Sequence, residues 1–377
     1  MTISFFSNFL NHHQLPLCEE FIRLVGVDNF HFIATDRISD ERTALGYEDM
    51  NERFPFVVKE YNEGETSVFS HKLAVSSDIA IFTPSAYHYC EERLKINRIC
   101  FLYIERQFKR GIISLVHPRV FRRYFGYQRH RNAPLYILCA GSFVAKDLRL
   151  FGFPKDKCFK WGYFPRVESI DIDAILNNRD NSCFKILWCA RFIPWKRPEL
   201  ALRLARDLRS KGYNFRLDMY GNGILLDKIR SLIHKWDLDE YVSIYGSVSN
   251  QVILDAMKAH NVLLVTSNKR EGWGAVINEA MGNGCTVVAS DDIGAVPYLI
   301  QNEINGYVFK SNSYKSLFRS IERLIIDLPK CDEFAKRSYH IISEKWTART
   351  AAQNLLLLND KLNGLDVNIN DGPCSKA

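Results

Sequence analysis

Short apolar runs alternate with longer amphipathic stretches along most of the chain. Such alternation is typical of βαβ units arranged around a parallel sheet. In the second half the runs are almost continuous in apolar residues, which is the pattern of strands buried on both faces. The strands predicted there are residues 184–189, 216–220, 242–245, 262–266 and 286–289.

Helix signals occupy the gaps between these strands. Residues 198–211 start with a proline, contain apolar residues at Leu200, Leu202, Leu204 and Leu208, and are followed by Gly212, and the proline and the glycine are signals for the start and the end of a helix. Residues 224–236 and 249–259 repeat the pattern. Residues 183–342 are therefore predicted to form one Rossmann-like domain.

The first half shows a weaker version of the same alternation. A second Rossmann-like domain is predicted for residues 1–168, with residues 36–64 as a polar, loop-rich insertion. Its predicted strands are residues 3–6, 31–34, 79–83, 99–103 and 136–139. A linker at residues 169–182, an amphipathic helix at residues 343–364 and a loose tail at residues 365–377 complete the predicted organisation.

Composition fits two globular domains rather than a fibrous, disordered or membrane-spanning chain. The 377 residues are 47% hydrophobic and 25% charged, and domains of roughly 100 to 200 residues are common. Ten cysteines are scattered without a Cys-x-x-Cys pair, which favours reduced thiols over disulfides or a zinc site. The N-terminal apolar run has no basic region before it, and no run reaches the roughly 18 to 20 residues that cross a bilayer. A cytoplasmic location is the prediction.

Positive charge is concentrated in one segment of the first domain. The formal net charge is +7, and residues 106–131 contain basic but no acidic residues, interleaved with Phe and Tyr. The basic residues are Arg106, Lys109, Arg110, Arg119, Arg122, Arg123, Arg129 and Arg131. Such a segment suits a membrane face, a nucleic acid or an acidic acceptor. Our hypothesis is peripheral docking on an anionic membrane leaflet.

Candidate binding residues follow the predicted strands of the second half, because ligands of parallel sheets bind at the carboxyl ends of the strands. Arg191 and Lys196 come directly after strand 184–189, and two cations on one loop fit a pyrophosphate. Strand 216–220 leads into Gly221-Asn222-Gly223, where either a ligand or a plain turn explains the glycines.

A stretch with two carboxylates, residues 271–282, follows strand 262–266. It places Glu271 in a glycine-rich loop and Glu279 about two turns into the next helix. Backbone N–H groups of the loop suit a phosphate, and Glu279 suits the vicinal hydroxyls of a ribose. Taken alone, two glutamates at this spacing are explained as well by a solvated helix face.

Three motifs follow one another along the chain: the pair Arg191 and Lys196, the turn at residues 221–223, and residues 271–282. In this order they resemble the donor-binding half of a retaining GT-B glycosyltransferase, most closely glycosyltransferase family 4. The resemblance covers residues 184–310, and the spacing of Glu271 and Glu279 matches the paired glutamates of the family. It implies an α/β fold with two Rossmann-like domains facing a central cleft, and a C-terminal helix that crosses back to the N-terminal domain. It also implies sugar transfer from a nucleotide-diphosphate donor to an acceptor hydroxyl with retention, in bacterial surface polysaccharide, capsule or glycolipid assembly.

The resemblance assigns roles to individual residues. Arg191 and Lys196 are expected to hold the diphosphate and stabilise the leaving group, Glu271 to contact the donor sugar and Glu279 to bind the ribose. The other expected donor-site residues are Gly221, Val248 beside the nucleobase, Gly272, Trp273, Gly274, Ala275 and Val276. No metal or cofactor is expected, and the expected partners are a nucleotide sugar and a glycan or lipid-linked acceptor.

The N-terminal domain departs from the family pattern, because Asn11-His12-His13-Gln14 replaces the glycine-rich loop after the first strand. His13 is a candidate for a catalytic or acceptor-binding role, and His12, Glu105 and Arg106 are further candidates. A nicotinamide-dependent dehydrogenase needs Gly-x-Gly-x-x-Gly after its first strand, which neither half contains. An inactive GT-B homologue and a basic nucleic-acid or membrane-surface binding protein stay as alternatives.

Overall fold

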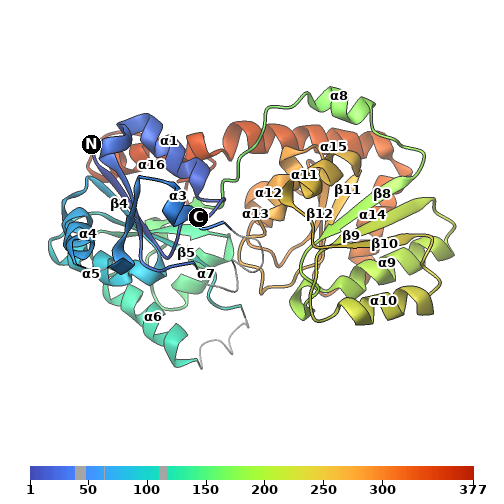
Figure 1. Ribbon diagram of the computed structural model, residues 1–377, viewed down its shortest axis with the longest axis horizontal. Helices are drawn as coiled ribbons and strands as arrows, with labels where there is room; N and C mark the ends of the chain where they lie inside the picture. Colours follow the sequence, from blue (N-terminus) through green and yellow to red (C-terminus); the bar gives the residue numbers. More distant parts are fainter. Residues whose placement is uncertain (39–47, 63, 110–116) are drawn as a thin grey trace. The chain divides into compact units, whose positions relative to one another are not determined.

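The computed structural model describes residues 1–38, 48–62, 64–109 and 117–377, which divide into two compact units (Figure 1). The first unit consists mainly of Met1–Phe108, residues 117–166 and Trp346–Ala377, and the second mainly of Val167–Lys345. The chain therefore returns to the first unit after Lys345. There α16 (Ala348–Leu362) lies beside α1 (Leu15–Val25), which confirms the predicted return of the C-terminal helix.

A seven-stranded parallel sheet forms the centre of the first unit, in the order β3-β2-β1-β4-β5-β6-β7. The strands are β1 (Ile3–Ser7), β2 (Phe30–Ala34), β3 (Val57–Lys59), β4 (Ile79–Phe82), β5 (Cys100–Glu105), β6 (Leu135–Ala140) and β7 (Cys158–Trp161). Besides α1 and α16, the helices are α3 (Met50–Arg53), α4 (Glu65–Ser76), α5 (Tyr87–Lys95), α6 (Pro118–Arg129) and α7 (Phe143–Arg149). Strand β1 is buried throughout, and Phe6 stacks on Phe82 at 4.9 Å, so the core lies at the middle of the sheet.

The last residues of the chain pair with the edge of this sheet, so the prediction of a loose tail at residues 365–377 is wrong for residues 372–377, whereas residues 365–371 form no helix or strand and are mostly exposed. The backbone N–H of Cys374 donates to the carbonyl of Lys160 in β7 (2.8 Å), the N–H of Lys160 donates to Ser375 (2.7 Å), and that of Ala377 donates to Cys158 (3.1 Å). Cys374 is buried. The polar composition of the tail concealed this pairing, because backbone hydrogen bonds to an edge strand require no particular side chains.

Deletion of residues 372–377 is expected to destabilise the first unit by about 1.5 kcal/mol, at about 0.5 kcal/mol for each lost backbone hydrogen bond. Urea denaturation of the truncated and full-length chains measures this difference. Lys376→Ala is the control, because it keeps the backbone bonds, and we expect a smaller loss from it. An unchanged denaturation midpoint after the deletion would contradict a stabilising role for the tail.

A six-stranded parallel sheet forms the centre of the second unit, in the order β10-β9-β8-β11-β12-β13. The strands are β8 (Phe184–Cys189), β9 (Phe215–Tyr220), β10 (Val242–Gly246), β11 (Val262–Val265), β12 (Thr286–Ser290) and β13 (Tyr307–Phe309). The helices are α8 (Ile172–Asn177), α9 (Pro198–Ser210), α10 (Leu226–Lys235), α11 (Asn250–Ala259), α12 (Val276–Gly282), α13 (Val296–Leu299), α14 (Tyr314–Ile326) and α15 (Leu328–His340). Helices α9 and α10 pack on one face against Ile186, Trp188 and Leu217, and α11 and α12 cover the other (Figure 1).

Both sheets have a point at which the strand order reverses. In the first sheet β1 lies between β2 and β4, and in the second β8 lies between β9 and β11. The loops that follow the two neighbouring strands run to opposite faces there, which leaves room for a ligand at the carboxyl ends. The loops after β1 and β4, and those after β8 and β11, are therefore the places to look for a site.

All five strands predicted in each half are present, and three further strands were missed. Strands β3, β7 and β13 have three or four residues each, which is too short for their periodicity to stand out. Strand β3 lies in the predicted loop-rich insertion at residues 36–64. The predicted helix at residues 343–364 is also interrupted, because a π-helical turn at Ile341–Lys345 comes before α16.

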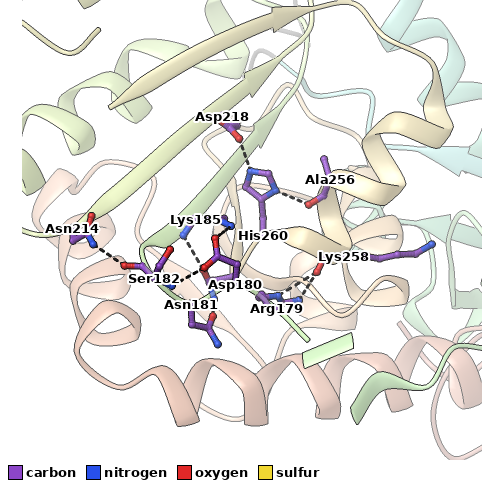
Figure 2. A network of polar contacts seen from close by, with 11 residues as sticks. Arg179, Asp180, Asn181, Ser182, Lys185, Asn214, Asp218, Ala256, Lys258 and His260 are labelled. Atoms are coloured by element: carbon purple, nitrogen blue, oxygen red, sulfur yellow. Dashed lines mark hydrogen bonds and ion pairs between the residues drawn. The ribbon is translucent and has the colours of Figure 1, made fainter. Parts of the chain in front are cut away.

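A network of polar contacts joins the segment after α8 to the second sheet (Figure 2). Arg179 is buried and donates to the carbonyls of Lys258 (3.1 Å) and Gly284 (2.9 Å). His260 lies between the carboxylate of Asp218 in β9 (2.9 Å) and the carbonyl of Ala256 (2.6 Å). These contacts tie the segment after α8 to strand β9 and to the residues that precede β11 and β12, and none of them involves a predicted site residue.

Candidate functional site

The loop after β8 carries Arg191 and Lys196 at the switch point of the second sheet. A 3₁₀ turn ends at Lys196, and the next residue, Arg197, has a left-handed backbone conformation with φ of 52°. The Arg197 guanidinium donates to the carbonyls of Thr266 (2.6 Å) and Ser311 (2.8 Å), which anchors the loop to the end of β11. Sequence analysis did not select Arg197 as a site residue, because its partners are backbone carbonyls that no motif marks.

Gly221 and Gly223 allow the loop after β9 to approach this loop closely. A Cβ atom at Gly221 would lie 2.1 Å from the carbonyl oxygen of Ala190, and one at Gly223 would lie 2.6 Å from that of Phe192. The N–H of Phe192 donates to the carbonyl of Asn222 (2.9 Å). Gly221 thus positions the loop that carries Arg191, and contact between Gly221 and the donor stays a prediction.

Lys196 and Glu271 come together from the loops after β8 and β11. The ammonium of Lys196 forms an ion pair with the Glu271 carboxylate, and each side chain is 17% exposed. Arg191 is exposed, with its guanidinium 5.9 Å from the centre of the Trp195 ring. The site therefore holds one paired and partly buried cation and one that faces solvent.

Residues 272–276 lead into α12, and the buried side chain among them is that of Trp273. Trp273 is 1% exposed, and its Nε1 donates to Asn278 (2.8 Å). Gly274 has φ of 95°, and a Cβ atom there would lie 2.9 Å from Ile293. Gly272 is also buried, whereas Ala275 and Val276 are half-buried. Any ligand contact from Trp273 is thus through its backbone.

Glu279 lies in the first turn of α12, not two turns into the helix as predicted, because the helix begins only at Val276. Burial raises the pKa of Glu279 to about 7. Burial and then the Glu279 carboxylate raise the pKa of Cys189, at the end of β8, to about 12, while Lys196 lowers it. Glu279 and Lys196 therefore both lie close enough to the carboxyl end of β8 to shift the pKa of Cys189.

Replacing Glu279 by glutamine is expected to stabilise the protein above neutral pH. The pKa of Glu279 is 4.5 when unperturbed and about 7 in the fold, so between these values the folded state keeps a proton that the unfolded state has lost. The stability that this group contributes is full below its unperturbed pKa and is lost as the pH rises through 7.

Because Glu279 is partly exposed, solvent screening limits the expected effect to about 1 to 2 kcal/mol. Urea denaturation from about pH 5 to pH 8 should show the difference between Glu279→Gln and the unsubstituted protein growing with pH. Glu168→Gln, on the exposed surface, is the control for the removal of one carboxylate. Parallel curves for Glu279→Gln would be inconsistent with the raised pKa.

Val248 follows β10 and is 38% exposed at the same edge of the sheet. Near it, the ring of Tyr245 is 51% exposed and stacks on Tyr220, with centroids 4.7 Å apart and planes 9° apart. Sequence analysis missed this pair. Its signal in the sequence is a tyrosine at or beside the last position of two neighbouring strands, Tyr220 in β9 and Tyr245 in β10.

A cavity of about 520 Å³ lies at the switch point of the first sheet. Its lining residues are Ser7, Asn8, Phe9, Asn11, His12, His13, Gln14, Asp36, Thr83, Pro84, Ser85, Tyr103, Glu105, Gln107 and Tyr163. His12, His13 and Glu105 thus share one cavity. Arg106 is not in the lining, because its Nε donates to Asp147 (3.1 Å).

His13 is held uncharged at neutral pH. Burial, and then the adjacent His12, lower the pKa of His13 to about 3. Its Nδ1 is buried without a hydrogen-bond partner. An imidazole with so low a pKa is a weak proton acceptor, so hydrogen bonding fits His13 better than general-base catalysis.

Comparison with solved structures identifies the fold. The structure of Anabaena Alr3699/HepE in complex with UDP aligns over 97% of this chain and 100% of that chain, with a TM-score of 0.70 and 18% identity. That of a mutant of S. aureus TarM in complex with Fondaparinux, alpha-GlcNAc-glycerol and UDP aligns over 80% of this chain and 58% of that chain, with a TM-score of 0.57 and 17% identity. The chain has the GT-B fold.

Sequence comparison agrees with this GT-B assignment. Residues 173–341 match the family of glycosyl transferases group 1. The chain is 26% identical over 170 residues to the poly(ribitol-phosphate) alpha-N-acetylglucosaminyltransferase of Staphylococcus aureus, which is 45% of this chain and 34% of that protein. It is 29% identical over 225 residues to the poly(glycerol-phosphate) alpha-glucosyltransferase of Bacillus subtilis, which is 58% of this chain and 32% of that protein. The GT-B chain thus spans about a third of the length of each of these two relatives.

The basic segment of the GT-B chain forms α6 and its flanks, with Arg110 outside the described residues. Tyr124 and Tyr127 face the core, whereas Phe121 and Phe125 are 51% and 43% exposed. In the described part of the chain, no group of three or more His, Cys, Asp or Glu side chains is placed to hold a metal ion. No described helix is both long and apolar enough to span a bilayer.

Proposed function

We propose that this chain is a retaining hexosyltransferase, which moves a sugar from a nucleoside-diphosphate donor to an acceptor hydroxyl. The observation that carries the proposal is the ion pair between Lys196 and Glu271 at the switch point of the second sheet. Both residues lie inside the region that matches glycosyl transferases group 1. The two relatives are named for polyol-phosphate polymers, and the solved structures contain UDP. A UDP-sugar is therefore the first donor to test, in bacterial surface polysaccharide, capsule or glycolipid assembly.

The charges of the site suggest how it acts on such a donor. The diphosphate replaces the Glu271 carboxylate as the partner of Lys196, which releases Glu271 toward the hydroxyls of the donor sugar. Arg191, which faces solvent, is available to a second phosphate group. Negative charge develops on the diphosphate as it leaves, and cations placed in advance stabilise that charge. With its pKa near 7, Glu279 is able to donate to or accept from a ribose hydroxyl.

The first unit supplies the acceptor side of this proposal. His13 and the cavity around it bind the acceptor, and the basic face of α6 docks on an anionic membrane leaflet at the inner face of the plasma membrane. Exposed Phe121 and Phe125 beside arginines fit such an interface. Vesicle flotation that did not depend on anionic lipid would remove the membrane part of the proposal.

A thermal-shift screen tests the donor site. The probes are UDP, GDP, ADP, CMP and their common sugar conjugates, with NAD and a short nucleic acid as controls. A nucleotide at about 100 times its dissociation constant adds about 2.7 kcal/mol of stability. We expect a shift with one diphosphate nucleotide that is lost in Glu279→Ala. A shift with nucleic acid alone would favour the basic binding protein, and no shift with any probe would favour an inactive homologue.

A further inference from the structure

A groove with a volume of about 600 Å³ lies at the outer edge of the second sheet, between the edge strand β13 and helix α14. No residue of its lining is among the predicted site residues. The lining residues are Asn302, Glu303, Tyr307, Val308, Lys310, Ser313, Lys315, Ser316, Arg319, Ser320, Glu322 and Arg323.

The groove extends along the whole of β13. At one end, Lys310 directly follows the strand, and its backbone N–H donates to the hydroxyl of Ser316 in the first turn of α14 (3.2 Å). At the other end, Glu303 precedes the strand and forms an ion pair with Arg323 in the last turn of α14 (2.7 Å). The helix therefore runs antiparallel to β13, and the groove is elongated.

Positive charge in this groove exceeds what its carboxylates neutralise. The cations of the lining are Lys310, Lys315, Arg319 and Arg323, and its carboxylates are Glu303 and Glu322. Glu303 is paired with Arg323, and Glu322 with Lys211 (2.6 Å), which is not part of the lining. Arg319 also lowers the pKa of Glu322, but less than Lys211 does. With the described residues, Lys310, Lys315 and Arg319 form no ion pair, and all three are exposed.

Three of these cations form a row on α14. Lys315, Arg319 and Arg323 are four residues apart, and residues at this spacing share one face of a helix. At a rise of about 1.5 Å per residue, neighbouring members of the row are about 6 Å apart along the helix axis. Evenly spaced cations in an elongated groove suit a chain of repeated anionic groups better than a single compact anion.

The lining favours a phosphodiester chain without nucleobases. Proteins hold single-stranded nucleic acids partly through aromatic side chains on which the bases stack. Tyr307 is the one aromatic residue among the described residues of the lining. It is 8% exposed, and the guanidinium of Arg323 is 5.7 Å from the centre of its ring. Lysine and arginine are the usual partners of phosphate, and a small polyol between two phosphates spans the separation of the cations on α14.

We propose that this groove binds a linear polyol-phosphate chain, with phosphates on Lys310, Lys315 and Arg319. The inference goes beyond the proposed function, because the groove belongs neither to the donor loops nor to the cavity of the first unit. It is connected to the donor loops, since the carbonyl of Ser311, next to Lys310, accepts from Arg197 (2.8 Å). A chain held in the groove thus reaches the edge of the sheet that carries these loops.

Fluorescence anisotropy with the full chain tests this inference. The probe is a labelled hexamer of glycerol phosphate, and the variant combines Lys315→Gln with Arg319→Gln. Both side chains are exposed, so the variant is expected to fold. We expect it to bind the hexamer at least about tenfold more weakly at about 50 mM salt. The slope of log affinity against log salt is expected to fall by about 1.4, at about 0.7 for each lost phosphate contact.

Arg230→Gln combined with Lys235→Gln is the matched control, because it removes the same charge from exposed positions on α10 in the same unit. It is expected to leave hexamer binding nearly unchanged. Unchanged binding in the groove variant, or an equal loss in this control, overturns the inference.

Three further probes test the class of ligand. They are glycerol 3-phosphate, a hexamer of thymidylate and a hexamer of galacturonate, and each is expected to bind more weakly than the glycerol phosphate hexamer. Equal or tighter binding of the single phosphate, the nucleic acid or the carboxylate chain overturns the inference. Hexamer binding is measured without nucleotide, so it does not depend on the proposed donor. The UDP thermal shift is expected to persist in the groove variant, and its loss there would overturn a site separate from the donor loops.

Discussion

Lys196→Ala is expected to lower kcat/KM for the sugar donor by about 30- to 150-fold, equivalent to about 2 to 3 kcal/mol of transition-state stabilisation. The loss is large because Lys196 is partly buried, where its charge is screened less than on the surface. The thermal midpoint is expected to change little, since the ion pair is not fully buried. Steady-state kinetics with the donor found in the nucleotide screen measures the effect.

Lys211→Ala is the matched control for this experiment. Lys211 also forms an ion pair with a glutamate, Glu322 at 2.6 Å, but it lies at the end of α9 and not at a carboxyl end of the sheet. Its loss is expected to leave kcat/KM unchanged. A double-mutant cycle with Glu271→Gln separates the coupling of the pair from the contact with phosphate. Activity of Lys196→Ala within about threefold of the unsubstituted enzyme would show that the phosphate assignment is wrong.

The sheets and the helices of this protein were largely predictable from sequence, because buried parallel strands are almost continuous in apolar residues. Strands such as β8 and β11 stand out for this reason, and the loops after them contain the motifs that point to nucleotide binding. The ion pair between Lys196 and Glu271 joins two of these motifs. It follows from the strand order, which places β8 beside β11.

The features that sequence did not predict depend on contacts between distant backbone atoms or on burial. Arg197 donates to two carbonyls from other loops, and Cys374 pairs with an edge strand, and neither contact leaves a pattern in the local sequence. The raised pKa of Glu279 and the lowered pKa of His13 arise from burial. In the cavity of the first unit, the ring of His13 likewise stacks on that of Tyr163, which is far from it in sequence.

Gly221→Ala is expected to cost about 3 to 5 kcal/mol of stability, or to displace the loop that carries Arg191. Gly221 has φ of 127°, and the added Cβ atom would lie 2.1 Å from the carbonyl oxygen of Ala190, a backbone atom that has no rotamer to change. If the loop moves, Arg191 leaves its position and the nucleotide thermal shift falls. If the loop stays, the strain appears as a lower denaturation midpoint.

Gly212→Ala separates the two sources of this strain. Gly212 also has a positive φ, 73°, but a Cβ atom there meets nothing within 4 Å, so its cost is that of the backbone conformation alone, about 1 to 2 kcal/mol. The excess loss in Gly221→Ala therefore measures the close approach of the loops after β8 and β9. Equal losses in the two variants, with the nucleotide shift intact in both, would mean that this approach neither stabilises the fold nor positions Arg191.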